Sequence, residues 1–211
     1  MNSTAFKQVV HSEEELRSLF GYPGELVKNK CIDSIDAHCR DYISKTPLLF
    51  IATSDSTGCC DVSPRGDAEG FVCVLNDKHL VIPERPGNRR FDSLRNILAN
   101  PQIGLIFIIP GLEETLRING RAAIVKDPDI MERMAAHGKT PLVGIGVEVE
   151  ECYIHCAKAF KRSQCWDPGH WPAKEDLPRP AAIIAAHVKH MGVTEEDVAQ
   201  SLKESYEKRL Y

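Results

Sequence analysis

From Leu48 onward the sequence is divided into short runs of apolar and β-branched residues, with turn-forming residues between them. Residues 55–58 separate two such runs within 48–64, and residues 76–78 separate two more within 71–83. Short strands joined by tight turns predict β-hairpins. Strands joined by hairpins are antiparallel, so this pattern favours an antiparallel sheet over an alternating βαβ fold.

Three further strands are predicted in the same part of the chain. Ile103–Ile109 is apolar on both faces, as expected of a central strand, and 114–125 and 144–155 are longer. Single helices are expected between strands at 89–100, which Asn-Pro closes, and at 127–137. Six or seven strands with few helices predict a mainly β domain, namely an antiparallel barrel with peripheral helices.

Helices are also predicted before and after the barrel. Ser12 and Glu15 form a capping box for a helix that starts at Glu13, and Asp33 is expected to cap a second helix that ends before Pro47. After four prolines between 166 and 180, helices are expected at 181–190 and, capped by Thr194, at 195–210. We therefore expect a single domain over 1–211, made of N-terminal helices (1–46), a barrel core (47–165) and a Pro-rich segment with a helical tail (166–211).

Composition excludes several classes of protein. Hydrophobic residues make up 43% of the 211 positions, enough for a sizeable core, so a disordered chain is excluded. With 26 Lys and Arg against 30 Asp and Glu, the net charge is −4, and no overall positive field attracts nucleic acid or an anionic membrane. The longest apolar runs, 47–52 and 103–110, are too short to cross a bilayer, and residues 1–12 lack a signal-peptide core. We expect a cytoplasmic protein.

The eight cysteines do not form a metal-binding or redox motif. They are scattered and include no C-x-x-C pair, so we expect reduced and mostly buried thiols. Cys152 and Cys156 fall on one face of a predicted strand and His155 on the other, which disfavours chelation. No metal site is predicted.

The segment from Arg85 to Asn96 is the most unusual in the chain, since it holds four arginines, turns at Pro-Gly and starts a helix. Unpaired N–H groups at a helix N-terminus, together with guanidinium groups, suit a phosphate monoester. The alternative is a solvated basic turn whose arginines pair with Glu84 and Asp92.

Two rows of polar side chains alternate with apolar ones along predicted strands. The first row is Asp61, Ser63 and Arg65, and the second is Thr115, Arg117 and Asn119. On neighbouring strands such rows could line a cleft for a flat polar ligand. The alternative is that both rows face water.

Taken together, three segments resemble the flavin-binding core of the pyridoxamine 5'-phosphate oxidase-like family, in its PPOX-class FMN-dependent branch. They are Asn88–Pro101, the apolar strand 103–109, and Leu112–Ala122, and the resemblance extends over about 33–166. It implies an antiparallel Greek-key split β-barrel of the FMN-binding type, with FMN at the interface of a homodimer.

The resemblance also implies a role for individual residues. Asn88, Arg89 and Arg90 would hold the FMN phosphate, with possible contacts from Ser93 and Asn96. Carried over by position, the other flavin contacts are Ser63, Pro64 and Arg65 along the ring and ribityl chain, Ile82 and Pro83 at the ring border, Thr115 and Arg117 from the other subunit, and Lys158, Arg162, Ser163 and Trp166 in a closing C-terminal segment.

An FMN-dependent oxidoreductase of unknown substrate is the function that the resemblance implies. Arg65 or Arg117 would stabilise the negative charge of reduced flavin. True pyridoxamine phosphate oxidases end in an Arg-x-His substrate clamp, which residues 166–171 do not match. The alternatives are a non-catalytic flavin-binding or storage protein, a split barrel that uses a deazaflavin or haem, and an anion-binding dimerisation module.

Overall fold

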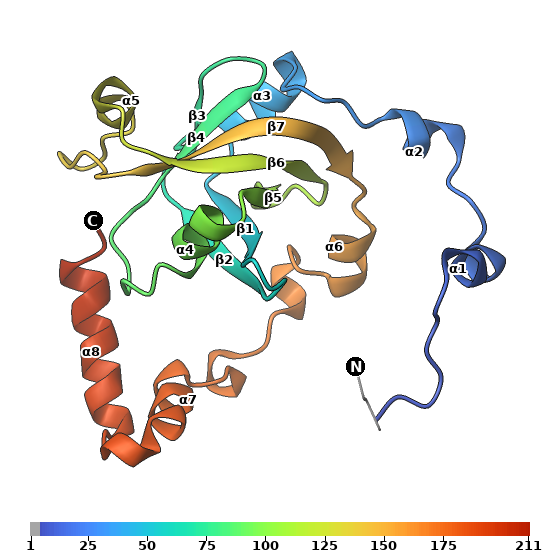
Figure 1. Cartoon of the computed structure of the whole chain (residues 1–211). Coiled ribbons are helices and arrows are strands. Elements are labelled where there is room, and N and C mark those ends of the chain that lie inside the picture. Colours follow the sequence, from blue (N-terminus) through green and yellow to red (C-terminus); the bar gives the residue numbers. More distant parts are fainter. Residues whose placement is uncertain (1–4) are drawn as a thin grey trace.

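The structure is a computed structural model that describes residues 5–211, so the first four residues of the predicted N-terminal segment lie outside it. Its centre is a seven-stranded sheet in which every pairing is antiparallel (Figure 1). The strands are β1 (Leu48–Ser54), β2 (Cys60–Gly66), β3 (Cys73–Val74), β4 (His79–Pro83), β5 (Gln102–Ile108), β6 (Thr115–Val125) and β7 (Gly144–His155). The predicted mainly β, antiparallel architecture is confirmed.

The sheet is open in the described residues. Its hydrogen-bonded order is β2-β1-β5-β6-β7-β4-β3, so β2 and β3 are the two edges. Both predicted hairpins are present, since β1 pairs with β2 and β3 with β4. The closure that a barrel requires is not formed by these pairings, and the Greek-key barrel stays a prediction.

The hydrophobic core lies on one face of this sheet. Ile51, Leu105, Ile118 and Cys152 stand opposite one another on β1, β5, β6 and β7, and each is at most 1% exposed. Residues directly opposite in an antiparallel sheet point to the same side. The next row, Phe50, Ile106, Arg117 and Tyr153, therefore points to the other face. Phe50 is 36% exposed there.

A bulge between Asn119 and Gly120 interrupts the pairing of β6 with β7. A Cβ at position 120 would collide with the carbonyl oxygen of Glu148. The close approach of the two backbones therefore requires glycine at this position.

The N-terminal helices are α1 (Glu13–Phe20), α2 (Glu25–Asn29) and α3 (Ala37–Ser44). α1 begins where predicted, and Ser12 Oγ accepts a hydrogen bond from the Glu15 N–H at 3.2 Å. The prediction that Asp33 caps the next helix is wrong. Asp36 caps α3, because its Oδ1 accepts the Cys39 N–H at 2.7 Å, whereas Asp33 pairs with Lys78 at 2.7 Å.

Helix α4 (Asp92–Ala99) lies over the sheet and contacts β1, β2 and β6 (Figure 1). It begins three residues later than the predicted start at Arg89. Arg89 and Phe91 have φ angles of 61° and 58°, in the left-handed region, which a right-handed helix excludes.

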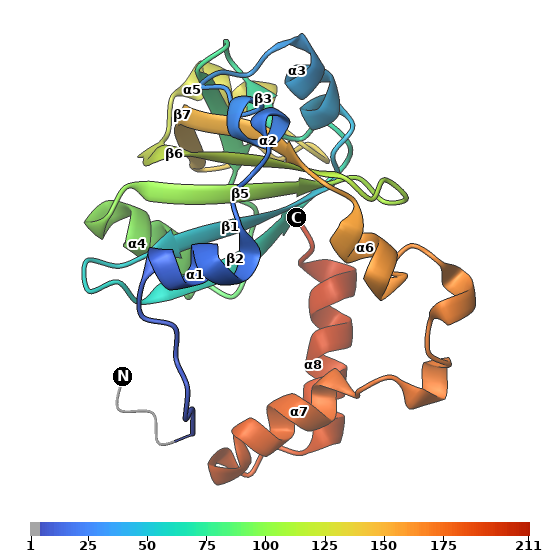
Figure 2. The same cartoon turned by 90° about the vertical axis from the view of Figure 1, so that its right-hand side faces the viewer.

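The remaining helices are α5 (Pro128–Arg133), α6 (Lys158–Ser163), α7 (Pro180–His187) and α8 (Glu195–Lys208). The predicted capping box of the last helix is confirmed, because the side chains of Thr194 and Asp197 each accept a hydrogen bond from the other's backbone. α7 and α8 pack on each other, and the chain returns from α8 toward the sheet (Figure 2). None of the helices within 5–211 has the length and hydropathy needed to cross a membrane.

Candidate functional site

Helix α4 places polar side chains against one end of β2. Ser93, 2% exposed, donates from its Oγ to the Oγ of Ser63 at 3.3 Å. Asn96 donates from Nδ2 to Asp61 at 2.9 Å and to Thr53 at 3.1 Å. The polar row of β2 therefore faces α4, and two of the predicted flavin contacts, Ser63 and Ser93, touch each other.

The arginines before α4 differ in their pairing. Arg90 donates from Nε to Asp92 at 2.9 Å, and its N–H donates to Asn88 Oδ1 at 3.0 Å. Arg89 is exposed, and its guanidinium has no ion-pair partner within residues 5–211. The Nε of Arg90 is therefore paired within the turn, as the alternative of a solvated basic turn expects, and the guanidinium of Arg89 remains available for an external anion.

The turn is also held in an uncommon backbone conformation. Four non-glycine residues of the described chain have a left-handed φ, and Arg89 and Phe91 are two of them. Each such residue costs on the order of 1 kcal/mol or more, and these conformations cluster at ligand-binding sites. The left-handed backbone at Arg89 and Phe91 therefore also favours this turn as a candidate binding site.

The two polar rows predicted from the sequence do not line one cleft. β1 and β5 lie between β2 and β6. Moreover, Ser63 stands opposite the buried Ile51, whereas Arg117 belongs to the row of Phe50 and Ile106 on the other face. The rows thus point to opposite sides of the sheet. The pairing register of the strands decides this, and the alternation of residues along one strand cannot reveal it.

On the outer face, Arg117 is surrounded by groups that fix its orientation. Its Nε donates to Asn119 Oδ1 at 3.2 Å, its Nη2 lies 3.4 Å from Glu151, and its guanidinium lies 5.3 Å from the centre of the Tyr153 ring. Burial, with Arg117 and Lys30 nearby, lowers the pKa of His155. Thr115, at the start of β6, is only 7% exposed.

The other predicted contacts are more dispersed. Arg65 pairs with Glu84 at 3.1 Å, and Pro64 is exposed on the outer face opposite Phe50. Ile82 and Pro83 are buried, Ile82 completely and within the core, so the side chain of Ile82 does not face an open site.

The C-terminal segment lies beside the loop between β5 and β6. Lys158, Arg162 and Ser163 are exposed on α6. Trp166 donates from Nε1 to the carbonyl of Leu112 at 3.0 Å and stacks on Phe160 with ring centres 5.4 Å apart. Trp166 is therefore fixed in place, whereas Lys158, Arg162 and Ser163 are exposed to solvent.

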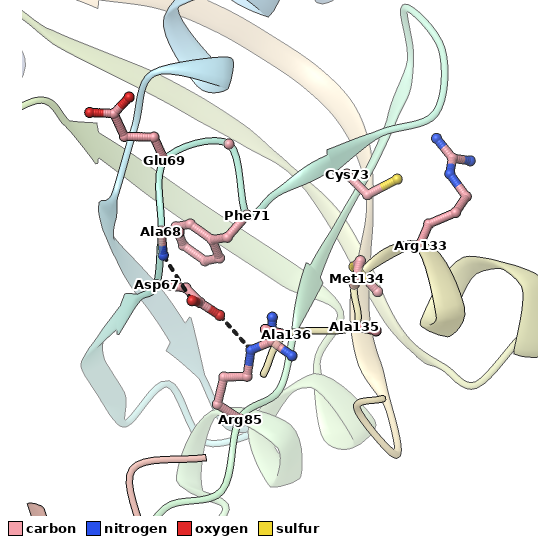
Figure 3. Close-up of a pocket in the computed structure, with 11 residues that line it drawn as sticks. Asp67, Ala68, Glu69, Phe71, Cys73, Arg85, Arg133, Met134, Ala135 and Ala136 are labelled. Carbon is pink, nitrogen blue, oxygen red and sulfur yellow. Dashed lines mark hydrogen bonds and ion pairs between the residues drawn. The ribbon is translucent and has the colours of Figure 1, made fainter. Parts of the chain in front are cut away.

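A pocket that sequence reasoning missed lies where β2 and β4 end (Figure 3). It has a volume of about 320 Å³, and its lining includes Asp67, Arg85, Arg133 and Phe71. Asp67 pairs with Arg85 at 2.6 Å and accepts hydrogen bonds from the Ala68 N–H and the Tyr211 hydroxyl, each at 2.8 Å. Burial opposes ionisation of Asp67, yet these three donors together lower its pKa.

Arg85 belonged to the predicted phosphate turn, but the structure uses it in this pocket. Its Nε is committed to Asp67, whose side chain is only 2% exposed. Tyr211 lies 144 positions from Asp67, so no local pattern indicates the contact. The sequence signal for this pocket was Asp67, a charged residue directly after the strand β2.

The cysteines differ from the prediction in their burial. All eight are free, as expected, but only Cys152 is buried, and five are exposed. The five exposed cysteines lie in loops or on the edge strand β2. The described residues contain no group of three or more potential ligands arranged for a metal ion.

The protein belongs to a mainly β class with a candidate anion site. Its antiparallel sheet has seven strands, α4 lies across the core face of the sheet, and a basic turn precedes α4. The comparison with protein families identifies the family, because the family model described as pyridoxamine 5'-phosphate oxidase matches residues 35–156. The chain belongs to this family.

Several solved structures resemble part of this chain at low sequence identity. HupZ from Group A Streptococcus is 20% identical, with a TM-score of 0.47, and the match covers 57% of this chain and 93% of that one. General Stress Protein 26 from Bacillus anthracis is 14% identical, with a TM-score of 0.42 and coverage of 56% and 93%. HutZ, the heme storage protein from Vibrio cholerae, is 17% identical, with a TM-score of 0.39 and coverage of 57% and 93%. No curated protein matches the chain.

Proposed function

We propose that the protein is an FMN-dependent oxidoreductase that binds flavin at the interface of a homodimer. The observation that carries the proposal is the turn before α4, where the exposed guanidinium of Arg89 has no ion-pair partner in the described chain and precedes the buried Ser93 on α4. The Ser93 hydroxyl contacts the hydroxyl of the half-buried Ser63. A phosphate monoester needs several hydrogen-bond donors and positive charge at one place. The donor set fits this group.

The opposite orientation of the two polar rows supports the dimer. The turn before α4 lies at the core face, whereas Arg117 points outward, so one chain does not present both to one flavin. A second copy can supply Arg117. The outer face also exposes apolar side chains, since Phe50 is 36% and Val62 is 67% exposed, as expected of a surface that another chain covers.

When bound, FMN would supply hydride transfer, and the residues of this chain would position it. Asn88, Arg89 and Arg90 would bind the phosphate and thereby fix the distance of the ring from the turn. Glu84 orients Arg65, and Glu151 orients Arg117. A guanidinium at the pyrimidine edge of the ring would stabilise negative charge there and favour the reduced flavin. Trp166, held by Leu112, would exclude water from one side.

The resemblance and the open sheet together favour a finer description of the fold. In the proposed dimer the curved sheet is a Greek-key split barrel, whose β2 edge takes part in the interface. The pocket lined by Asp67 and Arg85 is the candidate substrate site. These two residues follow closely after Arg65 and Glu84 in the sequence.

An absorption spectrum of the purified full chain tests the proposal directly. The spectrum is recorded as isolated and again after FMN is added and the protein desalted, and heat-released material is identified by mass spectrometry. Retained flavin bands with FMN released are expected. Deazaflavin or haem bands would replace FMN by another cofactor. A colourless protein that retains no added FMN would contradict the proposal and favour an anion-binding dimerisation module.

Turnover distinguishes an enzyme from a flavin-storage protein. The FMN-loaded chain is mixed anaerobically with nicotinamide and small-molecule electron donors, and bleaching of the flavin is followed. Rapid reduction by at least one donor is expected. Uniformly slow reduction by all donors would favour storage.

A further inference from the structure

Two cysteine thiols meet where α3 packs against β7. The Sγ atom of Cys152 lies 3.5 Å from the Sγ atom of Cys39, although the residues are 113 positions apart. Cys152 is completely buried, whereas Cys39 is half-buried and packs against the edge of the core. The proposed flavin function uses neither of them.

The surrounding structure holds the two sulfur atoms together. Two backbone hydrogen bonds of 3.0 and 2.7 Å join Ile32 to Cys152 just before α3 begins. Ile35 and Ile43, each 1% exposed, anchor both ends of α3 in the core. A disulfide has an S–S length of about 2.05 Å, so the two sulfur atoms must approach by about 1.5 Å for the bond to form.

The two thiols are chemically unequal. Cys39 is the third residue of α3, where the helix N-terminus stabilises a thiolate. The S–H group of Cys152 donates to Cys39 and lowers the pKa of the Cys39 thiol, while burial and the carboxylate of Asp36 oppose this. The same hydrogen bond, together with burial, raises the pKa of Cys152. Cys39 is therefore the nucleophile of the pair, and Cys152 is the buried partner.

The nearest further cysteine differs from Cys39 in its surroundings. Cys31 lies beside Glu151, and burial, with that carboxylate, raises the pKa of the Cys31 thiol. It is exposed, so access alone would favour its oxidation. Cys31 thus provides a natural comparison between exposure and thiolate character.

We propose that Cys39 and Cys152 form a hydroperoxide-reactive pair that oxidises to an intrachain disulfide between α3 and β7. The Cys39 thiolate attacks one peroxide oxygen, so that an S–O bond forms, the O–O bond breaks and hydroxide leaves and takes a proton to become water. Cys152 sulfur then attacks the Cys39 sulfenic acid, forms the S–S bond and releases a second water. In sum, two thiols lose two electrons and two protons, and one hydrogen peroxide becomes two waters.

Intact-mass analysis and peptide mapping of the full chain test this proposal. The protein is treated with one equivalent of hydrogen peroxide, unfolded in N-ethylmaleimide and digested without reductant. One linked pair of peptides containing Cys39 and Cys152 is expected as the main product. If both cysteines are alkylated while exposed cysteines are oxidised, or if Cys31 is the main partner of either residue, the proposal is overturned.

Variants assign the order of the two steps. In Cys152→Ser, Cys39 should stop at a sulfenic acid that dimedone captures, and Cys152→Ala repeats the test without a buried hydroxyl. In Cys39→Ser, oxidation of Cys152 should slow about tenfold or more. Cys31→Ser and the exposed Cys60→Ser are matched controls that should keep the disulfide. Loss of the disulfide in either control, with native circular dichroism, would contradict the assignment.

Discussion

Arg89 is the residue on which the proposed phosphate contact depends most. Its guanidinium has no ion-pair partner in the described chain, whereas the neighbouring Arg90 is paired with Asp92. A charge-assisted hydrogen bond contributes about 1.5 to 3 kcal/mol, so Arg89→Ala should weaken FMN binding about tenfold or more. Adding Arg90→Ala should weaken it further. Fluorescence titration with FMN measures both.

Arg95 offers a matched control for this prediction. It lies on α4, is exposed and carries the same charge, but one turn further from the predicted phosphate. Arg95→Ala should change FMN affinity less than twofold or so, because the loss is then only one of overall charge. Equal effects of Arg95→Ala and Arg89→Ala would show that net charge, and not a built site, determines binding.

Asp67 is predicted to make the stability of the protein depend on pH. Its pKa is lowered in the folded chain, so its contribution is complete above the unfolded value of about 3.9 and is lost as the pH falls through the folded value. Asp67→Asn should therefore destabilise the protein by about 1 to 3 kcal/mol at pH 7, and this effect should shrink as the pH falls below about 3.9. Urea unfolding at pH 7 and at one pH below that value measures the difference.

Glu69→Gln is the control, because it removes the same charge from an exposed residue that lines the same pocket. Its effect should be small at both pH values. A pH-independent effect of Asp67→Asn would mean that shape, and not ionisation, accounts for its role.

At the scale of elements, α3 shows how a cap is chosen. Asp33 and Asp36 are both acceptable N-cap residues, but the backbone begins its first helical turn only after Asp36. Asp36→Ala should cost about 1 kcal/mol of unfolding free energy, through loss of the bond to the Cys39 N–H. Asp33→Ala should cost less, because its ion pair with Lys78 is exposed. Thermal or urea unfolding compares them, and the reverse order would contradict the assigned cap.

Elements with a strong local pattern were predicted correctly. β4 and β7 begin and end as expected, and α1 begins as expected, since turn or cap residues that act locally bound these elements. α2 was missed because its five residues carry little periodicity, and α4 was predicted too long because the left-handed backbone at Arg89 and Phe91 depends on the packing of the turn. Local sequence patterns therefore predicted whether a segment is a helix or a strand better than they predicted the residues at which it begins and ends.

At the scale of the whole molecule, the outer face of the sheet is predicted to hold two chains together. Val62 is 67% exposed on β2, in the same face as Phe50. Val62→Lys would place a charge at the proposed interface, so the dimer dissociation constant should rise about tenfold or more, and FMN retention should fall with it. Sedimentation velocity over a range of concentrations measures the first quantity.

Leu142→Lys is the control for this experiment, since Leu142 is 90% exposed and lies in the loop before β7. It adds the same charge at a position with no proposed contact, and it should leave assembly unchanged. A monomeric wild-type protein, or equal effects of the two variants, would contradict the proposed interface.

The sequence by itself determined the antiparallel strands, the hairpins, the basic turn before α4 and membership of the family, because each depends on residues close together in the chain or on their order. Only the tertiary structure decided what depends on distant partners. The pairing register of the strands places the two polar rows on opposite faces of the sheet. The path of the folded chain brings Tyr211 to Asp67 and Cys39 to Cys152. The physical reason is that the alternation of residues shows which side chains of one strand share a face. Only the pairing of that strand with its neighbours decides whether this face lies on the core side or the outer side of the sheet.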